Sequence, residues 1–199
     1  MKHAHRTSGS RRRPAGSRHP DNRGAAIAEF ALLLPLLLLL VLGAMDFGRL
    51  VQTRLILANV SREGGSISSR QSSLDTTITS MLLSSCRPLD LRGRDGRIFI
   101  TRVTAGQSTK AATPTIGQRL AVGGLGVGSR IGSGSSNFGL TRNLYNRLIF
   151  RKATGAADIS ELTVVEVYYK YRPITPLPNM VRGMLANGDG VILWSKAVF

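Results

Sequence analysis

The most apolar stretch of the chain lies near its N-terminus. Ala25 to Met45 is apolar at every position except Glu29. At about 1.5 Å of rise per residue, a helix over this stretch is about 31 Å long, which matches the hydrocarbon core of a bilayer. The pattern therefore predicts one membrane-spanning helix over residues 25–45.

A second helical pattern follows directly and predicts an amphipathic extension over residues 46–65. Its apolar side chains fall mostly on one side of a helix, at Phe47, Leu50, Val51, Leu55, Leu57 and Ala58. We expect this side to pack on the C-terminal domain and the helix to end at Gly64-Gly65. A coiled-coil face shared with another subunit is the alternative, although these positions form no clean heptad.

Later segments carry strand patterns. β-Branched and aromatic residues, or strict alternation, predict strands at Arg97–Thr104, Glu161–Tyr171 and Val191–Phe199. Short helices are expected over Leu74–Cys86 and near Met180–Ala186, before a turn at Asn187-Gly188-Asp189-Gly190. The expected fold class is α+β: a long helix packed on a small antiparallel β-sheet head that occupies residues 66–199.

Glycine and serine dominate the middle of this head. Residues 105–142 contain glycine clusters at 123–128 and 132–134, but no Gly-Lys-Ser/Thr follows them, so a nucleotide site is disfavoured. We expect a flexible surface loop here. Asn143 to Arg151 fits a helix or a strand equally well. Glu161 and Glu166 are interpreted as charges on a strand surface.

Charge sets the expected topology. The net charge is +16, and residues 1–24 contain seven Lys or Arg and one acid. With so few apolar residues, this segment is expected to be a disordered basic arm. The positive-inside rule places it in the cytoplasm and the C-terminal head outside. The basic arm is interpreted as a topology signal, so no nucleic-acid partner is expected.

The residues that usually perform catalysis or bind metals are scarce. All three histidines lie in the arm, at His3, His5 and His19, and Cys86 is the single cysteine. The exported head thus lacks an imidazole that could act as a general base or metal ligand. We expect no catalytic residues, no metal, no cofactor and no enzyme activity.

The lone acid of the apolar run indicates processing. A carboxylate there is costly, which favours a functional role for Glu29. The stretch Arg23 to Phe30 resembles the processing site of type IV prepilin-like proteins, with a glycine, a small residue, Glu29 five positions past the cut and Phe30 after it. The resemblance implies cleavage between Gly24 and Ala25 by a prepilin peptidase. The alternative is that Glu29 lies at the membrane interface and Gly24 is a linker residue.

A wider resemblance covers residues 23–65. The segment RGAAIAEFALLLP, with Pro35 six residues after Glu29, is followed by Asp46-Phe47-Gly48-Arg49 and by Arg62-Glu63-Gly64-Gly65. Together these motifs resemble the TadE-like family, the pseudopilin-like proteins of tight-adherence (Flp) pilus systems. Membership implies a single-pass protein of the bacterial inner membrane that helps to assemble an adhesive pilus or a related secretion apparatus. Its implied partners are the lipid bilayer, other pilus subunits and inner-membrane assembly proteins.

Two further interpretations remain open at this stage. Pro35 removes a helical hydrogen bond, so it predicts a kink that is either a functional flexible point or a neutral bend. The basic head gives the second function hypothesis, a membrane-anchored binding module that engages an anionic envelope polymer.

Overall fold

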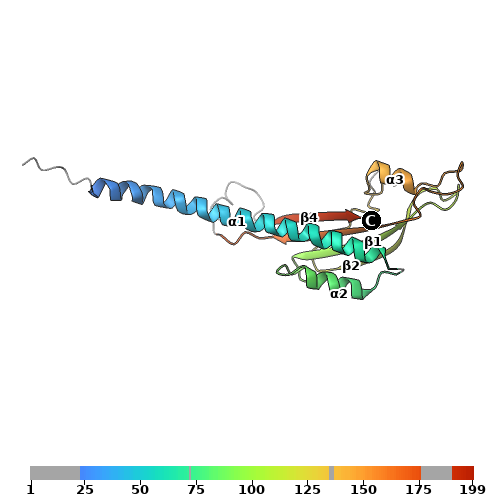
Figure 1. Ribbon diagram of the computed structural model, residues 1–199, viewed down its shortest axis with the longest axis horizontal. Coiled ribbons are helices and arrows are strands. Elements are labelled where there is room, and N and C mark those ends of the chain that lie inside the picture. The colour runs from blue at the N-terminus through green and yellow to red at the C-terminus, as the bar shows by residue number, and fades with distance from the viewer. Residues whose placement is uncertain (1–22, 72, 135–136, 176–189) are drawn as a thin grey trace, which may run out of the picture. The chain divides into compact units, whose positions relative to one another are not determined.

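A long helix, a four-stranded sheet and two short helices make up the part of the chain that the computed structural model describes, residues 23–71, 73–134, 137–175 and 190–199. In chain order the elements are α1 (Arg23–Ser69), α2 (Thr76–Ser85), β1 (Gly96–Thr104), β2 (Thr115–Val122), α3 (Arg142–Leu148), β3 (Glu161–Tyr171) and β4 (Val191–Val198) (Figure 1). The α+β class is confirmed.

The sheet is antiparallel throughout, with the strand order β2-β1-β3-β4. β1 and β3 are central because both faces of each are apolar, as the buried Val164 and Val165 show for β3. β2 and β4 are the edges. The register between β1 and β2 shifts at a bulge between Arg102 and Val103.

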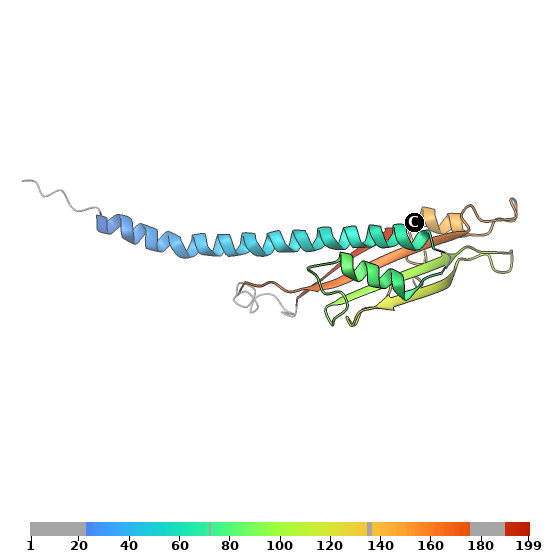
Figure 2. The ribbon, with the colours of Figure 1, turned by 60° about the horizontal axis from the view of Figure 1, so that its bottom comes forward.

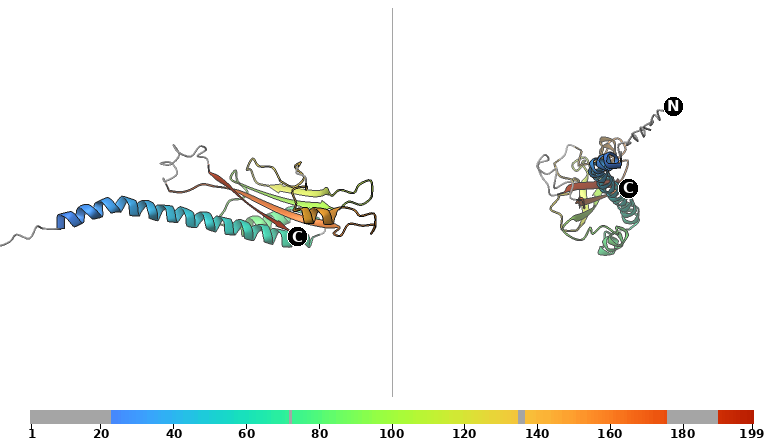
Figure 3. Two further views of the ribbon diagram at one scale, coloured as in Figure 1. Left: turned by 90° about the horizontal axis from the view of Figure 1, so that it is seen from above. Right: turned by 90° about the vertical axis from the view of Figure 1, so that its left-hand side faces the viewer.

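Helices α1 and α2 cover one face of this sheet (Figure 2). One core joins Leu57 of α1, Leu82 of α2 and Val165 of β3, all of them fully buried. The C-terminal residue Phe199 lies against the last turns of α1 (Figure 3), where its ring approaches Gly65. The helix face of the sheet therefore holds the main hydrophobic core of the head.

The structure corrects the expectation of a flexible loop over residues 105–142. This range contains the edge strand β2, and residues after it cover the second face of the sheet. Leu125, Ile131 and Leu140 are each less than 8% exposed there. These single apolar residues among many glycines are enough to attach the segment, because each enters a hydrophobic cluster with β1 or β3.

The packed face of α1 also differs from the expectation. Phe47 and Leu55 are 69% and 60% exposed, whereas Thr53 and Val60, which do not belong to the predicted apolar side, are buried. The helix does not end at Gly64-Gly65 but continues to Ser69. Within the head, the helix therefore turns Leu57, Val60 and several small or hydroxyl side chains toward the sheet, and leaves other apolar side chains outside.

The remaining expectations divide into three groups. The strands over Glu161–Tyr171 and Val191–Val198 and the helix over Thr76–Ser85 confirm their sequence patterns within a residue or two, and Arg142–Leu148 is helical. The expected helix near 180–186 lies outside the described residues, as does all but the last residue of the expected turn at 187–190. The basic arm over residues 1–24 lies outside them too, except for its last two residues.

Packing divides the chain at Leu40, and Val41–Phe199 form the unit that holds the head. The N-terminal part of α1 belongs to the other unit. It is apolar and long enough to cross a membrane, and none of its side chains from residue 24 to residue 40 is buried. These properties suit single-pass membrane anchoring.

Candidate functional site

The residues of the expected processing site lie together on the first two turns of α1. Gly24 and Ala25 are helical and exposed, and Glu29 follows Ala25 by one turn on the same side of the helix. Phe30 is 66% exposed. Pro35 lies inside the helix, one and a half turns further along. Cleavage and the roles of these residues remain predictions.

Asp46 connects α1 to the chain that follows β3. Its Oδ1 accepts hydrogen bonds from the backbone N–H groups of Ile174 (3.2 Å) and Thr175 (3.4 Å), and its Oδ2 accepts one from the Thr175 hydroxyl. The Tyr171 hydroxyl donates to the backbone carbonyl of Asp46 at 3.0 Å. The first residue of the Asp-Phe-Gly-Arg motif thus fastens the helix to the end of β3.

The charge of Asp46 is favoured by this arrangement. Desolvation of the carboxyl raises its pKa, but the hydrogen bonds from Thr175 and Ile174 and the positive charge of Arg49 together bring the pKa below its ordinary value. Burial and the Asp46 charge raise the pKa of the Tyr171 phenol. Of the other motif residues, Phe47 is 69% exposed, and a Cβ at Gly48 would meet nothing within 4 Å.

We expect Asp46→Asn to destabilise the head at neutral pH by about 1 kcal/mol, because a neutral amide accepts weaker hydrogen bonds than a carboxylate. The folded pKa is lowered, so the ionised group stabilises the fold above the unfolded pKa of about 3.9. That contribution is lost as the pH falls through the folded pKa. Urea unfolding followed by the fluorescence of Trp194, the single tryptophan, measures both effects.

The control is Asp158→Asn, which removes a half-exposed ion pair with Arg151 (3.0 Å). Its effect should be much smaller. The difference between the wild-type and Asp46→Asn stabilities should begin to shrink as the pH falls below about 5 and should go on shrinking until the pH is below the folded pKa. A pH-independent difference would contradict an electrostatic role for Asp46.

The glycines at the end of the expected motif have a packing role. A Cβ at Gly64 would lie 2.9 Å from Cδ1 of Leu82 and 3.3 Å from Cγ1 of Val165. A Cβ at Gly65 would lie 2.0 Å from the ring of Phe199. The two glycines therefore allow α1 to approach α2, β3 and the C-terminal residue closely, and do not terminate the helix.

Glu166 is the polar residue that the sequence interpretation placed wrongly. It is fully buried on the second face of the sheet, not on a solvated strand surface. Its carboxylate accepts hydrogen bonds from the Ser129 hydroxyl, from the backbone N–H of Arg130 (3.1 Å) and from the Tyr168 hydroxyl (3.1 Å). The guanidinium of Arg130 lies 4.1 Å from the ring centroid of Trp194. This cluster fastens the Gly/Ser-rich segment to β3 and β4.

Burial and the neighbouring Glu166 carboxylate raise the pKa of the Tyr168 phenol, which therefore stays neutral and donates its proton. No sequence signal separates Glu166 from an exposed strand carboxylate, because two of its three partners lie 36 and 37 residues away in the chain.

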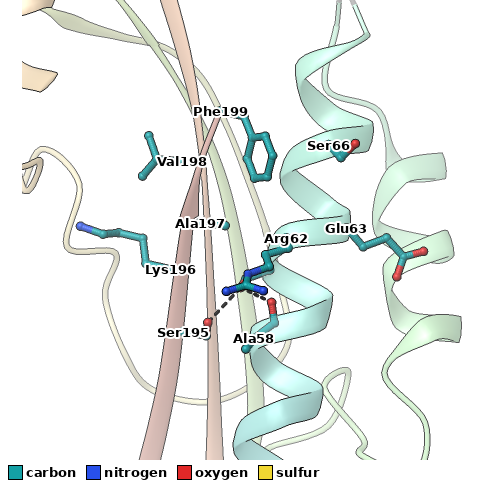
Figure 4. A pocket seen from close by; sticks show the side chains of 10 residues that line it. Ala58, Arg62, Glu63, Ser66, Ser195, Lys196, Ala197, Val198 and Phe199 are labelled. Carbon is teal, nitrogen blue, oxygen red and sulfur yellow. Dashed lines mark hydrogen bonds between the residues drawn. The ribbon is translucent and has the colours of Figure 1, made fainter.

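A groove with a volume of about 640 Å³ lies between α1 and the edge strand β4 (Figure 4). A hydrogen bond of 2.9 Å between the hydroxyls of Ser61 and Ser195 crosses it, and Ser61 is buried. Arg62 lines the groove, whereas Glu63 points toward α2, where its carboxylate accepts a hydrogen bond from Ser85 (3.2 Å).

Metal-binding chemistry has little support among the described residues, where no group of three or more His, Cys, Asp or Glu side chains could hold an ion. Cys86 is buried in the helix-face core, and desolvation raises the pKa of its thiol. The thiol thus stays protonated and packs as a small apolar group.

The comparisons with known proteins give one match. Residues 24–66 match the family model described as TadE-like protein, which confirms the resemblance stated for this segment. The match covers most of α1 and less than a quarter of the 199-residue chain. Neither the search of curated proteins nor the search of solved structures returned a match.

Proposed function

Because residues 24–66 form a TadE-like segment, we propose that this protein is a membrane-anchored, minor pseudopilin-like component that takes part in assembling a tight-adherence (Flp, type IVc) pilus or a related secretion apparatus. The family match over α1 carries this proposal. It is supported by the length and apolar character of the helix and by the small head that follows it.

In this function, α1 acts both as anchor and as assembly element. Residues 25–45 span the bacterial inner membrane once, with residues 1–24 in the cytoplasm and the head exported to the periplasm or beyond the cell. A prepilin peptidase cuts between Gly24 and Ala25, and the new α-amino group of a neighbouring subunit neutralises Glu29 inside the helix bundle. Pro35 provides a bend for extraction of the subunit from the bilayer. The partners are other pilus subunits and inner-membrane assembly proteins.

We expect the protein purified from membranes of cells with an active prepilin peptidase to begin at Ala25. Intact mass and N-terminal sequencing measure this directly. Changing Gly24 to a bulky residue such as Trp should leave the chain uncleaved, while the same change at Gly43, which lies within the apolar run but away from the cut, should not. A wild-type chain that retains residues 1–24 would contradict processing but not membrane anchoring.

Assembly is tested separately by deleting the gene and complementing it. Loss of surface pili in the deletion, restored by the wild-type chain but not by Glu29→Val, would support the function proposed here. Co-purification with neighbouring pilus subunits from the membrane fraction would identify the partners. Normal piliation and normal secretion without the protein would contradict the proposal.

A further inference from the structure

The outward side of α1 in the head carries a row of residues spaced alternately four and three apart. The row consists of Ala44, Gly48, Val51, Leu55, Ala58 and Arg62, which we call the outer seam. This spacing is the a/d pattern of a coiled coil. The sequence interpretation missed it because three small residues (Ala44, Gly48 and Ala58) and one arginine interrupt the apolar pattern, and because it assigned Val51 and Leu55 to the buried side.

Most of the outer seam is uncovered within the described part of the chain: five of its six residues are exposed, and Ala58 is half-buried beside the groove to β4. Leu55 is 60% exposed and Val51 39%, and a Cβ at Gly48 would meet nothing within 4 Å. Phe47, beside the seam, is 69% exposed. The side of α1 that packs on the head is the opposite one, through Leu57 and Val60. An apolar strip of this kind indicates an interaction surface.

The charges on this side of α1 restrict what can cover it. Arg62 occupies a seam position, and the exposed Arg54 flanks the seam beside Leu55. The two acids of this helical region are engaged elsewhere: Asp46 with residues 174 and 175, and Glu63 with Ser85. The exposed side is therefore positive as well as apolar.

We propose that the outer seam binds an acid-bearing helix of a different protein subunit, packed along α1 as a two-stranded coiled coil. A second copy of this chain, paired in register, would place Arg62 against Arg62, which like-charge repulsion disfavours. Alanine and glycine in the seam permit close approach of the partner backbone, and the groove beside Arg62 leaves room for a carboxylate side chain. This inference specifies a partner class and rests on the proposed function for the presence of such subunits.

The test uses the full chain in nanodiscs and two fluorescent helical peptides with the same apolar heptads, one carrying glutamates opposite Arg54 and Arg62 and one carrying lysines. Fluorescence anisotropy should show that the glutamate peptide binds about fivefold more tightly or better. Arg62→Glu should reverse this preference. Leu55→Asp should weaken both peptides about tenfold or more.

The matched control is Met81→Asp, which alters another exposed apolar residue (48% exposed, against 60% for Leu55) on α2 and should leave both affinities unchanged. All three substitutions are at exposed positions, so unchanged circular dichroism spectra verify the fold. Equal binding of the two peptides, or an equal loss in Met81→Asp, would overturn the proposal.

Cysteine crosslinking in membranes tests the competing occupant. In a Cys86→Ala background, Leu55→Cys should give no more disulfide-linked homodimer than Met81→Cys. A strong, specific dimer through position 55 would make a second copy the occupant and overturn the proposal. Because these measurements need neither peptidase cleavage nor pili, their failure is distinguishable from a failure of the proposed function.

Discussion

Glu166→Ala is expected to reduce the free energy of unfolding of the head by about 3–5 kcal/mol, because it removes the common acceptor of three hydrogen bonds from a buried site. The backbone N–H of Arg130 and the hydroxyl of Tyr168 would lose their partner without gaining water, since Tyr168 is only 3% exposed. The lost side-chain volume adds a cavity term.

The control is Glu161→Gln on the same strand, whose carboxylate pairs with Arg102 at a site where its side chain is 46% exposed. That change should cost about 1 kcal/mol or less. Urea unfolding followed by circular dichroism compares the two variants without relying on Trp194, which lies beside the cluster. Equal effects at the two positions would contradict the assignment of Glu166 as an anchor.

Hydrogen exchange would locate the damage. In Glu166→Gln, which keeps one acceptor and the side-chain volume, the amides of Arg130, Ile131 and Gly132 should lose protection before those of β1 and β3. The reason is that the cluster holds the segment over the second sheet face, whereas the strand ladders have their own hydrogen bonds.

The parts of the fold that local patterns determine could be predicted. Glu161–Tyr171 is rich in β-branched and aromatic residues over its eleven positions, and the strand occupies the same residues. The apolar run after Gly24 is long enough that no other element competes with a helix. In both cases, residues that are neighbours in the sequence determine the secondary structure.

The packed face of α1 could not be predicted, because it buries residues that are polar in isolation. Thr53, Ser61 and Ser68 lie on the head side of the helix, and each hydroxyl donates to a backbone carbonyl three or four residues earlier. This local hydrogen bond removes the cost of burying the hydroxyl. A hydrophobicity pattern treats such residues as solvent-exposed and assigns the more apolar outer side to the core.

The covering of the second sheet face and the contacts of Asp46 could not be predicted for another reason, which is that they depend on residues far apart in the chain. Leu125, Ile131 and Glu166 become informative only when the 123–140 segment lies on β3, and Asp46 finds its partners 128 and 129 residues away. Gly123, at φ 108°, makes the close turn that begins this segment, and its Cβ position is blocked by the carbonyl of Gly96 (2.3 Å). A composition rich in glycine was therefore compatible with both a flexible loop and a tightly packed cover.

Gly64→Leu is expected to destabilise the head by about 1–3 kcal/mol, in spite of the better helix propensity of leucine, because α1 approaches α2 and β3 most closely at this position. Even a Cβ would lie 2.9 Å from Leu82, and that side chain is fully buried between α1 and the sheet, so it cannot move into solvent. The longer leucine side chain would have to separate the helix from the core that joins α1, α2 and β3.

Gly48→Leu provides the matched control, since Gly48 is also helical but open to solvent. There the gain in helix propensity of about 0.8 kcal/mol should appear undiminished, so the two variants should differ in unfolding free energy by about 2–4 kcal/mol. Trp194 fluorescence during urea unfolding measures both, because the tryptophan lies on β4, where its ring packs on Arg130. Stabilisation of both variants would contradict close packing at Gly64. Destabilisation of Gly48→Leu would instead mean that the outer seam is already covered in the purified protein. The same pair of variants therefore tests both the packed side of α1 and its exposed side.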